Sequence, residues 1–124
     1  MKSRINTEGS GVNLLESLPI IRIILLVIIA QYPNSTGYEM MSYVQKHTDN
    51  YIIPKSGTIY SELRKMESET LVKSTLHESG RTKRKYELTK HGKAVLDQLI
   101  QVMKLKMEQV IFPIISLYED LRDN

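Results

Sequence analysis

The sequence predicts a mainly α-helical fold with a small β-hairpin and a long C-terminal helix. Over most of the chain, apolar residues recur at intervals of three and four, as on one face of an α-helix. Prolines and capping residues divide this helical part into separate segments. Two short runs in the middle of the chain fit strands instead, and a glycine lies between them.

The composition describes an ordinary globular chain. Its 124 residues suit one compact domain, and 41% of them are hydrophobic. The absence of cysteine excludes disulfides and thiolate-bound metals, and it fits a reducing compartment. We therefore expect a cytoplasmic protein without a cofactor.

The first predicted helix is strongly apolar from Leu18 to Ala30. As a helix this stretch would span about 20 Å, less than the roughly 30 Å of a membrane core. No small-residue cleavage site follows it, which argues against a signal peptide. We predict a helix buried on nearly all sides, with Ser17 as its N-cap and Pro19 in its first turn, ending before Pro33.

A second helix is predicted up to His47, with Ser35 or Thr36 as its N-cap. Glu39 stands three residues after Thr36, in the register of a capping box. The predicted buried stripe consists of Tyr38, Met41 and Val44. A loop from Thr48 to Pro54 should follow.

The third predicted helix, Lys55 to Ser68, has two contrasting faces. Ile59, Leu63 and Met66 share one face, which should pack on the core. The opposite face is small, hydroxylated and basic, and contains Thr58, Ser61, Arg64, Lys65 and Ser68. Such a face can enter a groove of DNA, where hydroxyls and cations bind phosphates and arginine can bind a guanine edge.

The strand-like runs, Leu71 to His77 and Lys83 to Thr89, predict a hairpin with a basic tip. Residues 55–93 contain ten basic and five acidic residues, a net charge of +5, whereas residues 1–54 sum to zero and residues 94–124 to −2. Positive charge confined to one segment is typical of nucleic-acid binding.

The last predicted helix begins near Thr89, its expected N-cap, and continues to Leu121. Its apolar seam suits a partner helix and consists of Leu96, Leu99, Met103, Met107, Val110, Ile114, Leu117 and Leu121. Met103 and Met107 could instead line a ligand pocket, although this spacing is more typical of core. Pro113 predicts a kink or break near Phe112.

Three short helices followed by a basic hairpin are the parts of a winged helix-turn-helix. We expect a flexible arm over residues 1–13, a winged-helix DNA-binding domain over 14–90 and a C-terminal dimerisation helix over 91–124.

The ordered motifs of residues 18–100 resemble the PadR family of transcriptional regulators. The matching segments are Thr36-Gly37-Tyr38-Glu39, the third helix from Ser56 to Glu67, Leu71-Val72, and Lys85-Tyr86-Glu87-Leu88-Thr89 with Gly92. The single short C-terminal helix resembles the smaller subgroup of this family.

This resemblance implies a homodimer that binds double-stranded DNA at a palindromic operator, usually as a repressor that a small, often aromatic ligand releases. No particular ligand follows from the sequence. Carried over residue by residue, the resemblance implies DNA contact from Lys55, Ser56, Thr58, Tyr60, Ser61, Arg64 and Lys65 in the third helix, and from Arg81, Lys83 and Arg84 in the wing.

Two departures from the family pattern affect these expectations. Thr70 stands where a glycine is usual, and a β-branched residue adopts the left-handed conformation poorly, so we expect a different turn there. The chain has no tryptophan, so the indole-stacking drug pocket of some small family members is not supported.

Several residues allow two interpretations. Tyr60 could contact DNA or pack at the helix flank, and Lys85 fits a solvated strand position better than a DNA contact. The histidines, His47, His77 and His91, fall in separate elements without a carboxylate cluster, so no metal site is expected. No nucleophile–base pattern or phosphate loop indicates an enzyme.

Two functions compete with sequence-specific regulation. A non-specific architectural DNA-binding protein would use the same basic segment without needing Arg64 or Ser61 in particular. A winged-helix protein-interaction module would not need the wing cations at all.

Overall fold

The computed structural model describes residues 13–79 and 81–123, without the side chains of residues 78, 79, 81 and 82. The expected flexible arm lies almost wholly outside the described residues. The chain forms two compact units, one of Pro19–Asp97 and one that joins residues 13–18 to the chain from Gln98 onward.

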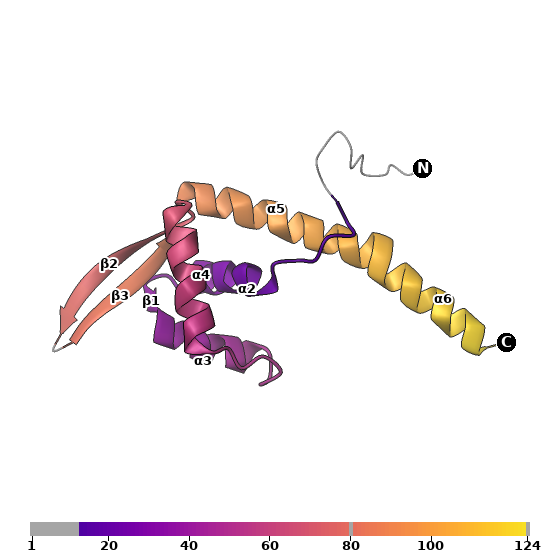
Figure 1. Cartoon of the computed structure of the whole chain (residues 1–124), viewed down its shortest axis with the longest axis horizontal. Coiled ribbons are helices and arrows are strands. Elements are labelled where there is room, and N and C mark those ends of the chain that lie inside the picture. Colours follow the sequence, from indigo (N-terminus) through magenta and orange to yellow (C-terminus); the bar gives the residue numbers. More distant parts are fainter. Residues whose placement is uncertain (1–12, 80, 124) are drawn as a thin grey trace. The chain divides into compact units, whose positions relative to one another are not determined.

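The first unit has the winged-helix architecture that the sequence predicts (Figure 1). Its elements are α2 Ile20–Gln31, β1 Ser35–Thr36, α3 Gly37–His47, α4 Ser56–Ser68, β2 Val72–Ser79, β3 Arg81–Leu88 and the first part of α5 Lys90–Lys106.

Strand β1 was not predicted, because two residues carry no strand pattern of their own. The antiparallel sheet has the order β1-β3-β2, and β1 pairs with β3 through Ser35–Tyr86 and Thr36–Lys85. This pairing holds the N-terminus of α3 beside the middle of β3.

The core of this unit lies between the three helices and the base of the sheet. Ile59, Leu63 and Met66 are fully buried, which confirms the predicted core face of α4. Their buried neighbours include Leu25, Leu26 and Ile29 of α2, Met40 and Val44 of α3, and Leu71, Val72 and Tyr86.

The predicted stripe of α3 was correct at Val44, which is fully buried, and wrong at Tyr38, which is 71% exposed. Gly37, Met40 and Val44 are the buried residues of the helix. Met40 and Met41 suit either phase by sequence, so packing against α2 and α4 decided between them. The capping box is confirmed: Glu39 N–H donates to Thr36 Oγ1 at 3.1 Å, and Thr36 N–H donates to Glu39 Oε1 at 2.9 Å.

Helix α2 starts later than predicted and is less completely buried. Pro19, rather than Ser17, is its N-cap, and the first helical bond runs from Ile23 N–H to the Pro19 carbonyl at 3.0 Å. Ile20 and Val27 remain 46% and 40% exposed. No helix among the described residues is long and apolar enough to cross a membrane.

Arg22, the cation in this apolar helix, links α2 to α4. Its Nε donates to Glu62, and its Nη1 and Nη2 donate to Glu69 at 2.8 and 3.1 Å. The hydrogen bond from Arg22 lowers the pKa of Glu69, which therefore stays ionised to lower pH than a free carboxyl.

Helix α4 ends in a Schellman turn with Thr70 in the left-handed position. Leu71 N–H donates to the Met66 carbonyl at 2.9 Å, and Thr70 N–H donates to the Glu67 carbonyl at 3.0 Å. Thr70 has a φ of 61°. The expectation of a different turn was therefore wrong, because these two hydrogen bonds and the buried Leu71 hold the chain in the conformation that glycine would favour.

The junction between the wing and α5 depends on Thr89 and Gly92. Gly92 N–H donates to Thr89 Oγ1 at 2.9 Å, which confirms Thr89 as the N-cap. The Thr89 N–H donates to the Leu71 carbonyl at 3.0 Å. A Cβ on Gly92 would lie only 1.9 Å from that same carbonyl oxygen, so no larger residue fits this junction.

In the second unit, the chain stays helical through Pro113, and the irregularity expected near Phe112 is a π-helical turn that interrupts the α-helix. Helix α5 passes into a π-helical turn, η1 Met107–Ile111, and then into α6 Phe112–Arg122. Phe112 N–H bonds the Met107 carbonyl, five residues earlier. The wider turn changes the carbonyl positions just before proline, where the ring would clash in a regular α-helix.

The π turn also changes how the apolar seam runs. A π turn holds about one residue more than an α turn, so the residues after it are displaced by about 100° around the axis. Ile114, Leu117 and Leu121 therefore do not continue the line of Leu96, Leu99 and Met103, as an unbroken α-helical repeat would require.

Replacing Thr70 by glycine should stabilise the protein. Glycine removes the left-handed strain of a β-branched residue, and after its greater flexibility is counted we expect a gain of about 1 kcal/mol in the free energy of unfolding. Urea unfolding measures this change. Ser68→Gly, two residues earlier in helical conformation, is the control and should destabilise; a loss of stability in Thr70→Gly would contradict the strain argument.

Candidate nucleic-acid interface

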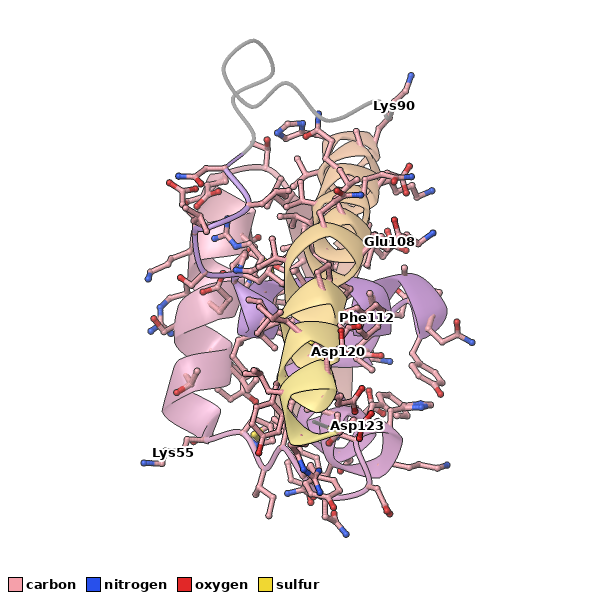
Figure 2. All side chains as sticks on the ribbon, turned by 90° about the vertical axis from the view of Figure 1, so that its right-hand side faces the viewer. Lys55, Lys90, Glu108, Phe112, Asp120 and Asp123 are labelled. Atoms are coloured by element: carbon pink, nitrogen blue, oxygen red, sulfur yellow. The ribbon has the colours of Figure 1, made fainter. Side chains whose placement is uncertain are left out.

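The outer face of α4 presents the residue types that the sequence predicts. Ser61 is half-buried, and the other predicted residues are exposed: Lys55, Ser56, Thr58, Tyr60, Arg64 and Lys65. The side chain of Lys55, at the start of α4, points outward (Figure 2). Because Ile59, Leu63 and Met66 are buried on the opposite side of α4, this is the face of the helix that remains free.

The two carboxylates of α4 and that of its C-cap, Glu69, are all bound within the protein. Glu62 and Glu69 pair with Arg22, and Glu67 accepts a hydrogen bond from Ser74 Oγ at 2.7 Å. Among the described residues, no hydrogen bond or ion pair engages the side chains of Arg64 and Lys65. The free face of α4 is therefore positive, although the helix itself contains two acidic residues beside two basic ones.

The wing adds further cations beside α4. Figure 1 shows β2 and β3 as a long hairpin, in which His77 pairs with Lys83 and Leu76 with Arg84. Lys83 and Arg84 are exposed, and Arg84 Nη1 donates to Ser74 Oγ at 2.8 Å. The side chain of Arg81, the third predicted wing cation, lies outside the described residues.

Ser74 thus joins the wing to α4 through a short polar chain from Arg84 to Glu67. Tyr86, which pairs with Ser74 in the sheet, is buried. This burial raises the pKa of Tyr86, and the negative charge of Glu67 adds to the effect. Tyr86 therefore stays neutral over the physiological range. The charged groups of this region stay at its surface.

A surface hollow of about 760 Å³ lies where α3, α4 and β3 meet. Its lining consists of Thr36, Gly37, Tyr38, Glu39, Tyr60, Lys83 and Arg84. The structure thus brings predicted residues of α4 and the wing together with the start of α3. Sequence reasoning missed the α3 residues as part of this surface, because only the unpredicted pairing of β1 with β3 places them there.

Two glycines near this surface differ in their surroundings. A Cβ on Gly37 would lie 2.5 Å from Tyr60 Cε1, whereas a Cβ on Gly57 would meet nothing within 4 Å. Inside the described chain, a side chain at position 37 would therefore have to displace the ring of Tyr60, whereas one at position 57 would displace nothing. The open space at Gly57 leaves the first turn of α4 accessible to an approaching molecule.

No group of three or more histidine, cysteine, aspartate or glutamate residues in the part of the chain that the structure describes could hold a metal ion. The chemistry of this surface is that of hydrogen-bond donors and cations.

The sequence matches a family of known proteins. Residues 24–98 match the family described as "Transcriptional regulator PadR-like family". No curated protein matches the chain by sequence.

Solved structures show the same fold. A PadR family transcription regulator from Clostridium difficile R20291 is 31% identical, with a TM-score of 0.57 over 73% of this chain and 97% of that one. A transcriptional regulator from Clostridium thermocellum is 25% identical, with a TM-score of 0.66 over 73% and 88%. Bacillus subtilis PadR in complex with operator DNA is 23% identical, with a TM-score of 0.62 over 68% and 48%, and shows the fold alone.

A family match over more than half of the chain thus agrees with the winged-helix fold and the basic outer face of α4. The chain belongs to the PadR-like family of transcriptional regulators.

Proposed function

We propose that the protein is a homodimeric repressor that binds a specific double-stranded DNA sequence through α4 and the wing. The observation that carries this proposal is the division of α4: its apolar stripe is buried, its carboxylates are bound by partners, and no hydrogen bond or ion pair within the described chain engages the side chains of Arg64 and Lys65 on its outer face.

In this proposal the residues have two kinds of role. Thr58, Ser61 and Arg64 face the major groove, where arginine can bind the O6 and N7 atoms of guanine together. The remaining cations bind backbone phosphates and supply most of the affinity without reading the sequence; they are Lys55, Lys65, Arg81, Lys83 and Arg84.

The proposed dimer rests on α6, which has no buried residue. Ile114, Leu117, Tyr118 and Leu121 recur at helical spacing and are 59–68% exposed. A continuous apolar face of this kind needs a partner. A two-fold partner copy would place two α4 helices about 34 Å apart, which predicts a pseudo-palindromic operator.

The proposal also includes repression and release by a small ligand. Both rest on family membership rather than on particular residues of the described surface. A reporter gene under the control of the bound sequence would decide the sign of regulation.

The protein should prefer the DNA upstream of its own gene over scrambled DNA of equal length. Fluorescence anisotropy over a salt series measures both affinities, and we expect a ratio of about 10³ or more. Equal and steeply salt-dependent binding to both DNAs would instead indicate an architectural protein. Absence of binding at low salt would refute DNA binding and favour a protein-interaction module.

Arg64→Ala should weaken binding to the specific DNA far more than binding to scrambled DNA. Loss of a two-pronged contact with a base costs about 1–3 kcal/mol, roughly five- to 100-fold in affinity. Lys104→Ala removes the same charge from the C-terminal part of α5 and serves as the control. Equal losses on both DNAs would show that Arg64 binds a phosphate rather than a base.

Leu117→Glu should convert the dimer to a monomer, because it places a charge in the middle of the apolar face of α6. Ser116→Glu adds the same charge on the opposite side of α6 and should leave the dimer intact. Light scattering after size exclusion measures the mass, which is 14.3 kDa for one chain. A wild-type protein that stays monomeric at micromolar concentration would rule out the dimer.

A further inference from the structure

We infer that Gly37 is a positioning residue, whose missing side chain lets Tyr60 lie across the start of α3 and donate its hydroxyl to a DNA phosphate. This inference rests on the proposed DNA binding. It assigns Gly37 a role in DNA binding that requires no contact between Gly37 itself and the DNA.

The space around Gly37 is filled by Tyr60. A Cβ at position 37 would lie 2.5 Å from Cε1, 2.8 Å from Cζ and 3.0 Å from the hydroxyl oxygen of that ring. Carbon atoms in contact normally lie about 3.5–4.0 Å apart, so an alanine would have to displace the ring.

The backbone itself does not need a glycine at this position. Gly37 is the first residue of α3, and its φ is not among the left-handed values of the chain. Alanine forms helices better than glycine. The close approach of Tyr60 is therefore the structural reason for glycine here.

Neither helix can move aside to make room for a side chain. The start of α3 is fixed by the Thr36–Glu39 capping box and by the pairing of Thr36 with Lys85 in the sheet. The start of α4 is fixed by Ile59, which is fully buried next to Tyr60. Tyr60 is 38% exposed and lines the hollow, so its ring can be displaced outward into the hollow.

The position of the ring matters because of what lines the same hollow. Lys83 and Arg84 of β3 line it together with Tyr60, so a neutral hydroxyl donor and two cations border the same space. Phosphate oxygens accept hydrogen bonds from hydroxyl groups and from cations alike. A ring pushed outward would carry its hydroxyl away from this site and would occupy the space that a phosphate needs.

A thermal unfolding cycle tests the steric contact without DNA. We expect Gly37→Ala to lower Tm in the wild-type protein and to raise it in a Tyr60→Ala background, where the ring is absent and the better helix former remains. An equal change of Tm in both backgrounds would overturn the contact. If Gly37→Ala does not fold, recovery of the fold in the double variant gives the same information.

A second cycle, with Tyr60→Phe, tests the DNA role. Phenylalanine keeps the ring and loses the hydroxyl. We expect Tyr60→Phe and Gly37→Ala each to weaken binding about ten- to 150-fold, the loss of one hydrogen bond to a charged group, and the double variant to bind no more weakly than Gly37→Ala alone.

The loss should be similar on upstream and scrambled DNA, because a phosphate contact carries no sequence information. A folded Gly37→Ala protein with wild-type affinity would overturn the inference, and so would losses that simply multiply in the double variant. Failure of the wild-type protein to bind any DNA would refute the proposed function itself, and that outcome is seen before any variant is made.

Discussion

The packing of Ile59, Leu63 and Met66 against α2 and α3 determines which residues of α4 the protein presents to its surroundings. These three side chains are fully buried, so α4 cannot rotate about its axis without exposing apolar surface or opening cavities in the core. Arg64 and Thr58 face outward as a consequence. The wing is placed by the same constraint, because the Schellman turn after Met66 leads the chain directly into β2.

Burial alone does not make this face positive; the placement of the carboxylates contributes as well. Arg22 is the only charged residue in the apolar helix α2, and it pairs with Glu62 of α4 and with Glu69 at its C-cap. Ser74 donates to Glu67 and also accepts a hydrogen bond from Arg84. These contacts hold the carboxylates within the protein, while Arg64 and Lys65 remain on the outer face, where they can attract phosphates over about 10 Å at moderate salt.

Local signals in the sequence were strong enough to predict most elements. The capping residues Thr36 and Thr89 and the stripe of α4 follow from short-range patterns, and the structure has them as predicted. The hairpin is also present, although its strands run to Ser79 and from Arg81, further toward the tip than predicted. The errors had two causes. The phase of α3 was hard to predict because adjacent methionines fit either face of the helix. The turn at Thr70 was mispredicted because the packing of the buried Leu71 outweighs the local preference of threonine.

The sequence by itself determined the fold class, the core face of α4 and the basic character of the middle segment, because each depends on residues only a few positions apart. Only the tertiary structure decided that Arg22 binds Glu62 and Glu69, that β1 brings Gly37 beneath Tyr60, and that a π turn rotates the apolar face of α6. The first two depend on residues 23 to 47 positions apart in the chain, and no short-range pattern encodes such a distance. The π turn is local, but it depends on how the helix accommodates Pro113, and the spacing of apolar residues alone fits an uninterrupted helix equally well.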